Sequence, residues 1–129
     1  MAVASTLESM ARELFDALDH KDFERLVRLA TDEVQGIDEI SRGWLRGRAA
    51  MEAYLTTLGE QVSNIRSTLS AIRTVEVGEV GILTLLLDQE YDMGGQRTSI
   101  HAPTSIVARR VDGDWRIVLL HSVPLAEES

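Results

Sequence analysis

An aspartate stands in an otherwise largely apolar stretch at residue 38. Side chains of a strand alternate between its two faces, so a strand over residues 34–40 places Asp38 beside Val34 and Ile40. Among apolar groups a carboxylate has a raised pKa, because burial disfavours its charged form. Such a group can take a proton from a carbon next to a carbonyl and return it. Asp38 is therefore the candidate catalytic base, and the alternative is a solvent-exposed aspartate at the end of a strand.

A second candidate for proton transfer pairs Asp88 with His101. The dipeptide Gly94-Gly95 is typical of a two-residue hairpin turn. Such a turn places Asp88 opposite His101, close enough for the carboxylate to orient and charge the imidazole. A three-residue turn shifts the pairing by one position and separates the two side chains. Both registers stay open at this point, and so does a simple surface position on the outer face of the sheet.

Several other chemistries lack their motifs. The chain has no cysteine, which excludes disulfides and thiolate catalysis. It has no H-E-x-x-H, G-x-S-x-G, G-x-G-x-x-G or P-loop sequence, so we expect no metal, no cofactor and no nucleotide site. A net charge of −8 disfavours nucleic acid as a partner. No apolar run approaches the roughly 20 residues that span a bilayer, so we expect no membrane partner. For a chain without cysteine, a cytoplasmic location is the default expectation.

Hydrophobic spacing predicts helices first and strands afterwards. An apolar stripe at helical spacing predicts a helix over 6–19, with Ser5 or Thr6 as its cap. Asp22 is expected to cap a short second helix, and a third follows the strand 34–40. That third helix spans about 47–61. Strands are expected over about 65–77 (with a bulge near 71–74), 80–91, 96–111 and 115–123, with turns at 78–79, 94–95 and 112–113.

This order predicts one α+β domain over residues 1–129, with helices packed on one side of a curved antiparallel sheet. The strand 80–91 is apolar on both faces, which is typical of a central strand. One face of the sheet would then cover the helices. The other would meet a second protomer, so we expect a homodimer.

The segment DGDWRIVLLHS at 112–122 resembles the closing hairpin of nuclear transport factor 2-like proteins. The preceding TSIVARR and the turn DMGG at 92–95 fit as well, and so does the helix, strand, loop and helix order of the first half. Over nearly its whole length the chain is similar to SnoaL-like domains, ketosteroid isomerases and the association domain of calcium/calmodulin-dependent protein kinase type II. The resemblance implies a cone, in which a curved sheet wraps an N-terminal helix and leaves a mostly apolar pocket.

The resemblance also implies functional positions. Asp38 falls where the isomerases carry their proton-shuttling aspartate. Leu14 and Ile106 fall where those enzymes carry their two oxyanion donors, and neither side chain can donate a hydrogen bond. An acid would therefore have to come from elsewhere. The residues expected to shape the pocket are Leu14, Trp44, Tyr54, Ile106, Leu120 and Ser122.

His121 occupies the histidine position of the closing strand. Strict alternation places it on one face with Trp115, Ile117 and Leu119, and places Leu120 and Ser122 on the other. In the related association domain the Ser122 face looks into the pocket, which implies a His121 outside it, at a subunit contact. The alternative is that His121 takes part in proton transfer.

Two functions follow. The first is binding of an apolar small molecule in the cone, with cofactor-free acid/base chemistry such as isomerisation, cyclisation or dehydration. The alternative is a non-catalytic dimerisation or ligand-sensing module, favoured by the absent oxyanion donors and by the two-sided apolar strand.

Overall fold

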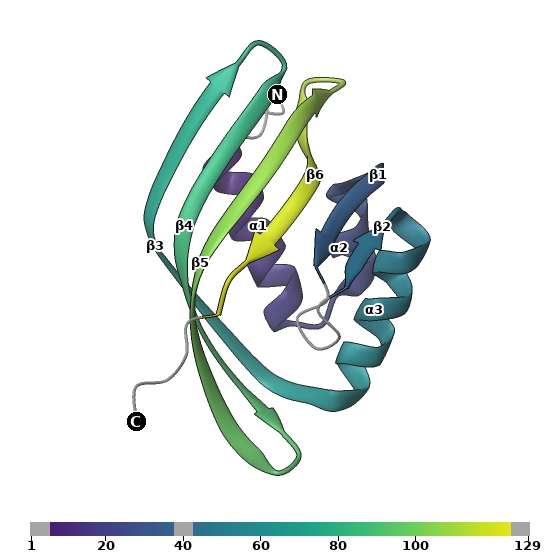
Figure 1. The fold of residues 1–129 in the computed structure, drawn as a ribbon, viewed down its shortest axis with the longest axis vertical. Coiled ribbons are helices and arrows are strands. Elements are labelled where there is room, and N and C mark those ends of the chain that lie inside the picture. Colours follow the sequence, from purple (N-terminus) through teal and green to yellow (C-terminus); the bar gives the residue numbers. More distant parts are fainter. Residues whose placement is uncertain (1–5, 38–42, 125–129) are drawn as a thin grey trace.

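The structure is a computed structural model that describes residues 6–37 and 43–124. Within these residues two helices are followed by two strands, a third helix and four further strands (Figure 1). The helices are α1 (Leu7–Asp19), α2 (Phe23–Arg28) and α3 (Arg48–Gln61), and the strands are β1 (Ala30–Ile37), β2 (Trp44–Arg46), β3 (Val62–Val77), β4 (Val80–Met93), β5 (Gln96–Val111) and β6 (Asp114–Ser122).

The strands form one sheet in the order β2-β1-β6-β5-β4-β3. β1 and β6 run parallel, and the other neighbours are antiparallel. The sheet curves around α1 without closing, and α2 and α3 lie beside the β1 end (Figure 1). This confirms the predicted α+β cone with a curved sheet wrapped around the N-terminal helix.

The core lies between α1 and the sheet. The predicted apolar stripe of α1 is buried, with Met10 and Leu14 at 1% and 2% exposure. It belongs to the same buried cluster as Leu83, Ile106 and Trp115. Burial of each apolar side chain of this size stabilises the fold by about 1.5–3 kcal/mol.

Side-chain caps explain where the first two helices begin. The Thr6 hydroxyl accepts the backbone N–H of Ser9 at 3.0 Å, and the Ser9 hydroxyl accepts that of Thr6 at 2.9 Å. The Asp22 carboxylate accepts the N–H of Arg25 at 3.2 Å at the start of α2. Each cap satisfies a backbone donor that the first turn leaves without a helical partner.

The structure decides between the two registers that the sequence left open for the long strands. The two-residue turn at Gly94-Gly95 pairs Met93 with Gln96, and Asp88 therefore lies opposite His101. The predicted bulge near 71–74 is confirmed by a register shift between Ser70 and Arg73. Within it Ala71 has a φ of 51°.

Three strands, β1, β2 and β4, differ in extent or place from the sequence-based expectation. β1 begins at Ala30 rather than at residue 34, because it pairs with β6 far along the chain, Ala30 opposite Ile117. β2 was missed, since its three residues carry no periodic pattern and are extended by pairing with β1. β4 lies between β5 and the edge strand β3, so it is an inner strand but not the central one.

Strict alternation along β6 was wrong. Val107 pairs with Leu119 while the next residue, Ala108, pairs with Ile117, so Val118 is an extra residue in β6. Such a bulge reverses which side chains point inward beyond it. As a result Leu120 and Ser122 lie on the same side as the buried Trp115 and Ile117, and Leu119 and His121 lie on the other.

None of the helices in the described ranges is long and apolar enough to cross a lipid bilayer.

Candidate functional site

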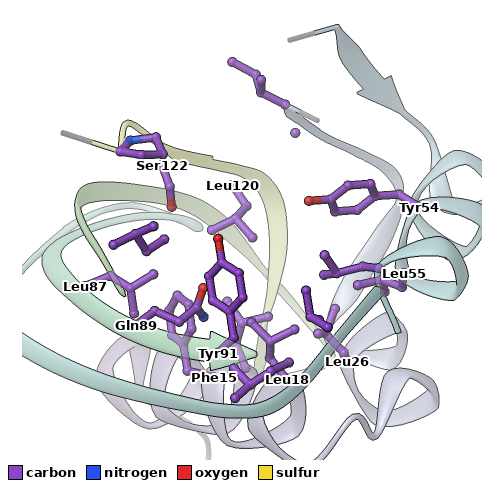
Figure 2. A pocket seen from close by; sticks show the side chains of 18 of the residues that line it. Phe15, Leu18, Leu26, Tyr54, Leu55, Leu87, Gln89, Tyr91, Leu120 and Ser122 are labelled. Atoms are coloured by element: carbon purple, nitrogen blue, oxygen red, sulfur yellow. The ribbon is translucent and has the colours of Figure 1, made fainter. Parts of the chain in front are cut away.

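A cavity of about 400 Å³ lies where the three helices face the inner side of the sheet (Figure 2). Every helix and strand contributes to its wall. The lining residues are Leu14, Phe15, Leu18, Leu26, Gly36, Ile37, Leu45, Met51, Tyr54, Leu55, Leu58, Gln61, Val62, Ile65, Leu87, Gln89, Tyr91, Met93, Ile100, Leu120, Ser122 and Pro124.

The wall is almost entirely apolar. Among its described residues none carries a formal charge at neutral pH, and five offer polar side-chain atoms, namely Tyr54, Gln61, Gln89, Tyr91 and Ser122. The phenol groups of Tyr54 and Tyr91 enter from different sides, one from α3 and the other from β4 (Figure 2). A few polar groups in an apolar hollow are typical of small-molecule sites.

Polar contacts set the position of α3, which carries Tyr54. The helix begins after Gly47, whose φ of 87° favours glycine. Arg48 then donates to the Ala30 carbonyl at 2.7 Å and forms an ion pair with Asp32 at 3.0 Å. These contacts tie the start of α3 to β1.

The far ends of β3, β4 and β5 are also tied together. Asn64 donates to the Asp92 carboxylate at 2.7 Å, and Arg97 donates to it at 3.2 Å. The Asn64 hydrogen bond, followed by that of Arg97, lowers the pKa of Asp92. Arg97 also donates to the Asn64 carbonyl at 2.7 Å. The charged cluster lies beside Tyr91 and holds the strand ends that complete the cavity wall.

Four of the six predicted pocket residues lie in this wall: Leu14, Tyr54, Leu120 and Ser122. Ile106 lies instead in the core at 0% exposure, paired with Leu83 and Leu120 on neighbouring strands. Trp44 is 56% exposed on the edge strand β2, where the Arg46 guanidinium lies 5.7 Å from its ring centroid.

Asp38, the candidate base, lies outside the described residues. The residue before it, Ile37, lines the cavity and ends β1.

The contact between Asp88 and His101, expected for one of the two possible registers, is present, but it lies away from the cavity. The Asp88 carboxylate oxygen and Nδ1 of His101 are 2.6 Å apart, and their side chains are 55% and 47% exposed. Their neighbours Leu87, Gln89 and Ile100 face the cavity, so the pair occupies the outer face. His121 is opposite Ser105 on that face as well.

Sequence reasoning did not identify Gln89 or Tyr91 as lining residues. The signal was present in β4, where residues 83, 85, 87, 89 and 91 share one face and the last two are polar-tipped. Within the described ranges no group of three or more His, Cys, Asp or Glu side chains could hold a metal ion.

N-terminal helices, a curved unclosed sheet and an apolar hollow between them define an α+β cone of the nuclear transport factor 2-like class. The chain belongs to the SnoaL-like domain family, whose model matches residues 7–126.

Solved structures share this fold. A ketosteroid isomerase-like protein from Erwinia carotovora atroseptica has a TM-score of 0.82 at 12% identity, covering 94% of this chain and 95% of its own. A candidate scytalone dehydratase from Novosphingobium aromaticivorans has a TM-score of 0.83 at 16% identity, and the match covers 93% of this chain and 82% of the dehydratase. A candidate calcium/calmodulin-dependent protein kinase type II association domain from Thiobacillus denitrificans has a TM-score of 0.76 at 24% identity. The match covers 98% of this chain and 100% of the association domain.

At these identities the similarity establishes the fold alone. No curated protein sequence matches the chain significantly.

Proposed function

We propose that this protein binds an uncharged, largely apolar small molecule in the cavity. The observation that carries the proposal is the wall itself, whose described residues are apolar or neutral and polar. A volume of about 400 Å³ falls within the range of roughly 300–1,000 Å³ that small-molecule sites occupy. A charged ligand would have to lose its hydration without meeting an opposite charge from this wall, which is costly.

Binding of simple aromatic probes tests the proposal. 2-Methylnaphthalene should bind saturably, as followed by its fluorescence, because its rings replace water against apolar side chains. 2-Naphthoate has a similar shape but carries a carboxylate, and it should bind at least about tenfold more weakly. Equal affinity for the two probes, or binding of neither, would count against an apolar ligand site.

The proposal extends to acid/base chemistry with Asp38 as the base. The described wall offers Tyr54 and Tyr91 as ionisable groups, and their phenols are candidates for the acid that Leu14 and Ile106 cannot supply. The solved relatives described as isomerase-like and as a candidate dehydratase support chemistry of this kind in such a cone. Isomerisation, cyclisation and dehydration of this kind combine a base with an acid or hydrogen-bond donor that stabilises the developing charge.

The ionisation of Asp38 is the first measurement for this extension. We expect the pKa of its carboxyl group to lie above the ordinary value of about 3.9, because a catalytic carboxylate in an apolar site is desolvated. NMR titration of labelled aspartates, with Asp38→Asn to assign the signal, measures the pKa directly. An ordinary value for Asp38 would remove it as the base and leave ligand binding unaffected.

The second candidate function is assembly, and a different surface favours it. Val75, Ile82, Val107 and Leu119 are paired in register and form an apolar row across the outer face. Val75 and Ile82 are 56% and 42% exposed. A row of this kind is typical of a surface that meets another protein, and we propose a homodimer through it. The solved structure described as a candidate kinase association domain supports this candidate.

Sedimentation tests the dimer. Ile82→Lys should shift the protein toward monomer at micromolar concentration, because a lysine ammonium would be buried between two copies. Thr57→Lys, on the exposed side of α3, should leave the distribution unchanged. A monomeric parent protein would contradict the proposed dimer. A cytoplasmic location stays a prediction from the composition.

A further inference from the structure

A hydrogen-bonded relay runs from the end of α1 into the cavity wall. Ser67 of β3 donates its backbone N–H and its hydroxyl to the Asp19 carboxylate, at 2.9 and 2.6 Å. The Gln89 side-chain amide donates to the Ser67 hydroxyl oxygen at 3.1 Å. All three residues are half-buried, and of the three only Gln89 lines the cavity.

The relay determines which way the Gln89 amide faces. A carboxylate can only accept, so the single hydroxyl proton of Ser67 goes to Asp19. The Ser67 oxygen can then only accept, and it accepts a hydrogen bond from the NH₂ group of Gln89. The carbonyl oxygen Oε1 and the second N–H of the amide are left for the cavity. The hydrogen-bond donors and acceptors along the relay thus determine which end of the Gln89 amide is nitrogen and which is oxygen.

Ser122 has a comparable arrangement on β6. The Thr104 hydroxyl donates to the Ala102 carbonyl at 3.2 Å and lies 2.8 Å from the Ser122 hydroxyl oxygen. With the Thr104 proton engaged, Ser122 is the donor in that contact. Its oxygen then offers lone pairs to the cavity that it lines. Gln89 and Ser122 both lie across the cavity from Tyr54 (Figure 2).

We propose that Gln89 is the specificity-determining residue of this cavity and that it selects apolar ligands carrying a hydroxyl group. A hydroxyl can donate to Gln89 Oε1 and accept from the second amide N–H. A ligand of the same shape without the hydroxyl would displace water and leave the oriented amide without a hydrogen-bond partner. A site of this kind discriminates strongly between ligands with the hydroxyl and analogues that lack it. Ser67 is a positioning residue, since it acts on the ligand through Gln89. The inference rests on the proposed function, because it requires that the cavity take up a ligand.

The test compares 2-naphthol with 2-methylnaphthalene, which differ by a hydroxyl in place of a methyl group. The measured quantity is the Kd of 2-methylnaphthalene divided by that of 2-naphthol, determined by fluorescence titration. Comparing this ratio between variants cancels the probes' different solubilities in water. Gln89→Leu should lower the ratio about tenfold, because the variant no longer pairs with the hydroxyl.

Ser67→Ala should lower the same ratio several-fold with Gln89 still present, while the Kd of 2-methylnaphthalene stays within about twofold. If Ser67 had a purely structural role, Ser67→Ala would instead weaken the binding of both probes equally. Ser67→Thr keeps the hydroxyl and should restore the ratio. Ser70→Ala makes the same change at an exposed position of β3 and should have no effect.

An unchanged ratio in both Gln89→Leu and Ser67→Ala, with both probes still bound, would overturn the inference and leave ligand binding intact. If the parent protein binds neither probe, the inference and the proposed function fail together.

Discussion

Replacing Ile106 by alanine is expected to lower the free energy of unfolding by about 2–5 kcal/mol. Ile106 is fully buried and lies between β4 and β6, opposite Leu83 and Leu120. Removing three of its side-chain carbons leaves a void within packed strands that neighbouring side chains cannot fill without distortion. Urea denaturation followed by circular dichroism measures the change.

Leu120→Ala is the matched comparison. Leu120 is half-buried and borders the cavity, so its truncation enlarges a hollow that already exists. We expect a smaller loss than for Ile106→Ala, below about 2 kcal/mol, since less packing is removed. Equal losses for the two variants would show that Ile106 lies in the cavity wall, as the sequence alone had suggested.

Introducing a carboxylate into the cavity wall with Ile100→Asp is expected to weaken binding of 2-methylnaphthalene by about 10- to 100-fold. Ile100 is half-buried on β5 and lines the cavity opposite Gln89. An aspartate is too short to extend its charge into solvent, so an apolar ligand that fills the cavity must strip water from it. The effective penalty for such desolvation is several kcal/mol per ion.

Ser99→Asp provides the control for Ile100→Asp. Ser99 is the preceding residue of the same strand and lies exposed on the outer face. The variant adds the same charge one position away, and its affinity for the probe should match that of the parent protein. Denaturation midpoints of both variants separate weaker binding from loss of fold. Unaltered affinity in a folded Ile100→Asp variant would place the bound probe outside the cavity.

Short-range patterns accounted for most of the helices and hairpins. The helical spacing of α1 and its Thr6 cap, the Asp22 cap of α2, and the turn at Gly94-Gly95 each act within a few residues. Such signals are complete in the sequence, because the groups that form the cap or the turn are neighbours along the chain. The register that they set extends over the whole of β4 and β5.

Elements whose structure depends on pairing with residues far away in the sequence could not be predicted from local patterns. β2 and the start of β1 depend on pairing within the sheet, and in β1 that pairing is with β6. The bulge at Val118 has no local sequence signal, yet it decides that Ser122 and not His121 shares a side with Trp115. The wall of the cavity is likewise assembled from nine elements, and Gln89 gains its orientation from residues on α1 and β3.

Asp88 and His101 show both contributions in one pair. The sequence limited the pair to two registers, and in the one with a two-residue turn opposite positions on paired strands bring the side chains together. The structure has that register. Only the tertiary structure decided that they meet on the outer face and not in the cavity. Which face of a sheet is inside depends on where the helices pack, and in this fold α1 covers the Leu83 side.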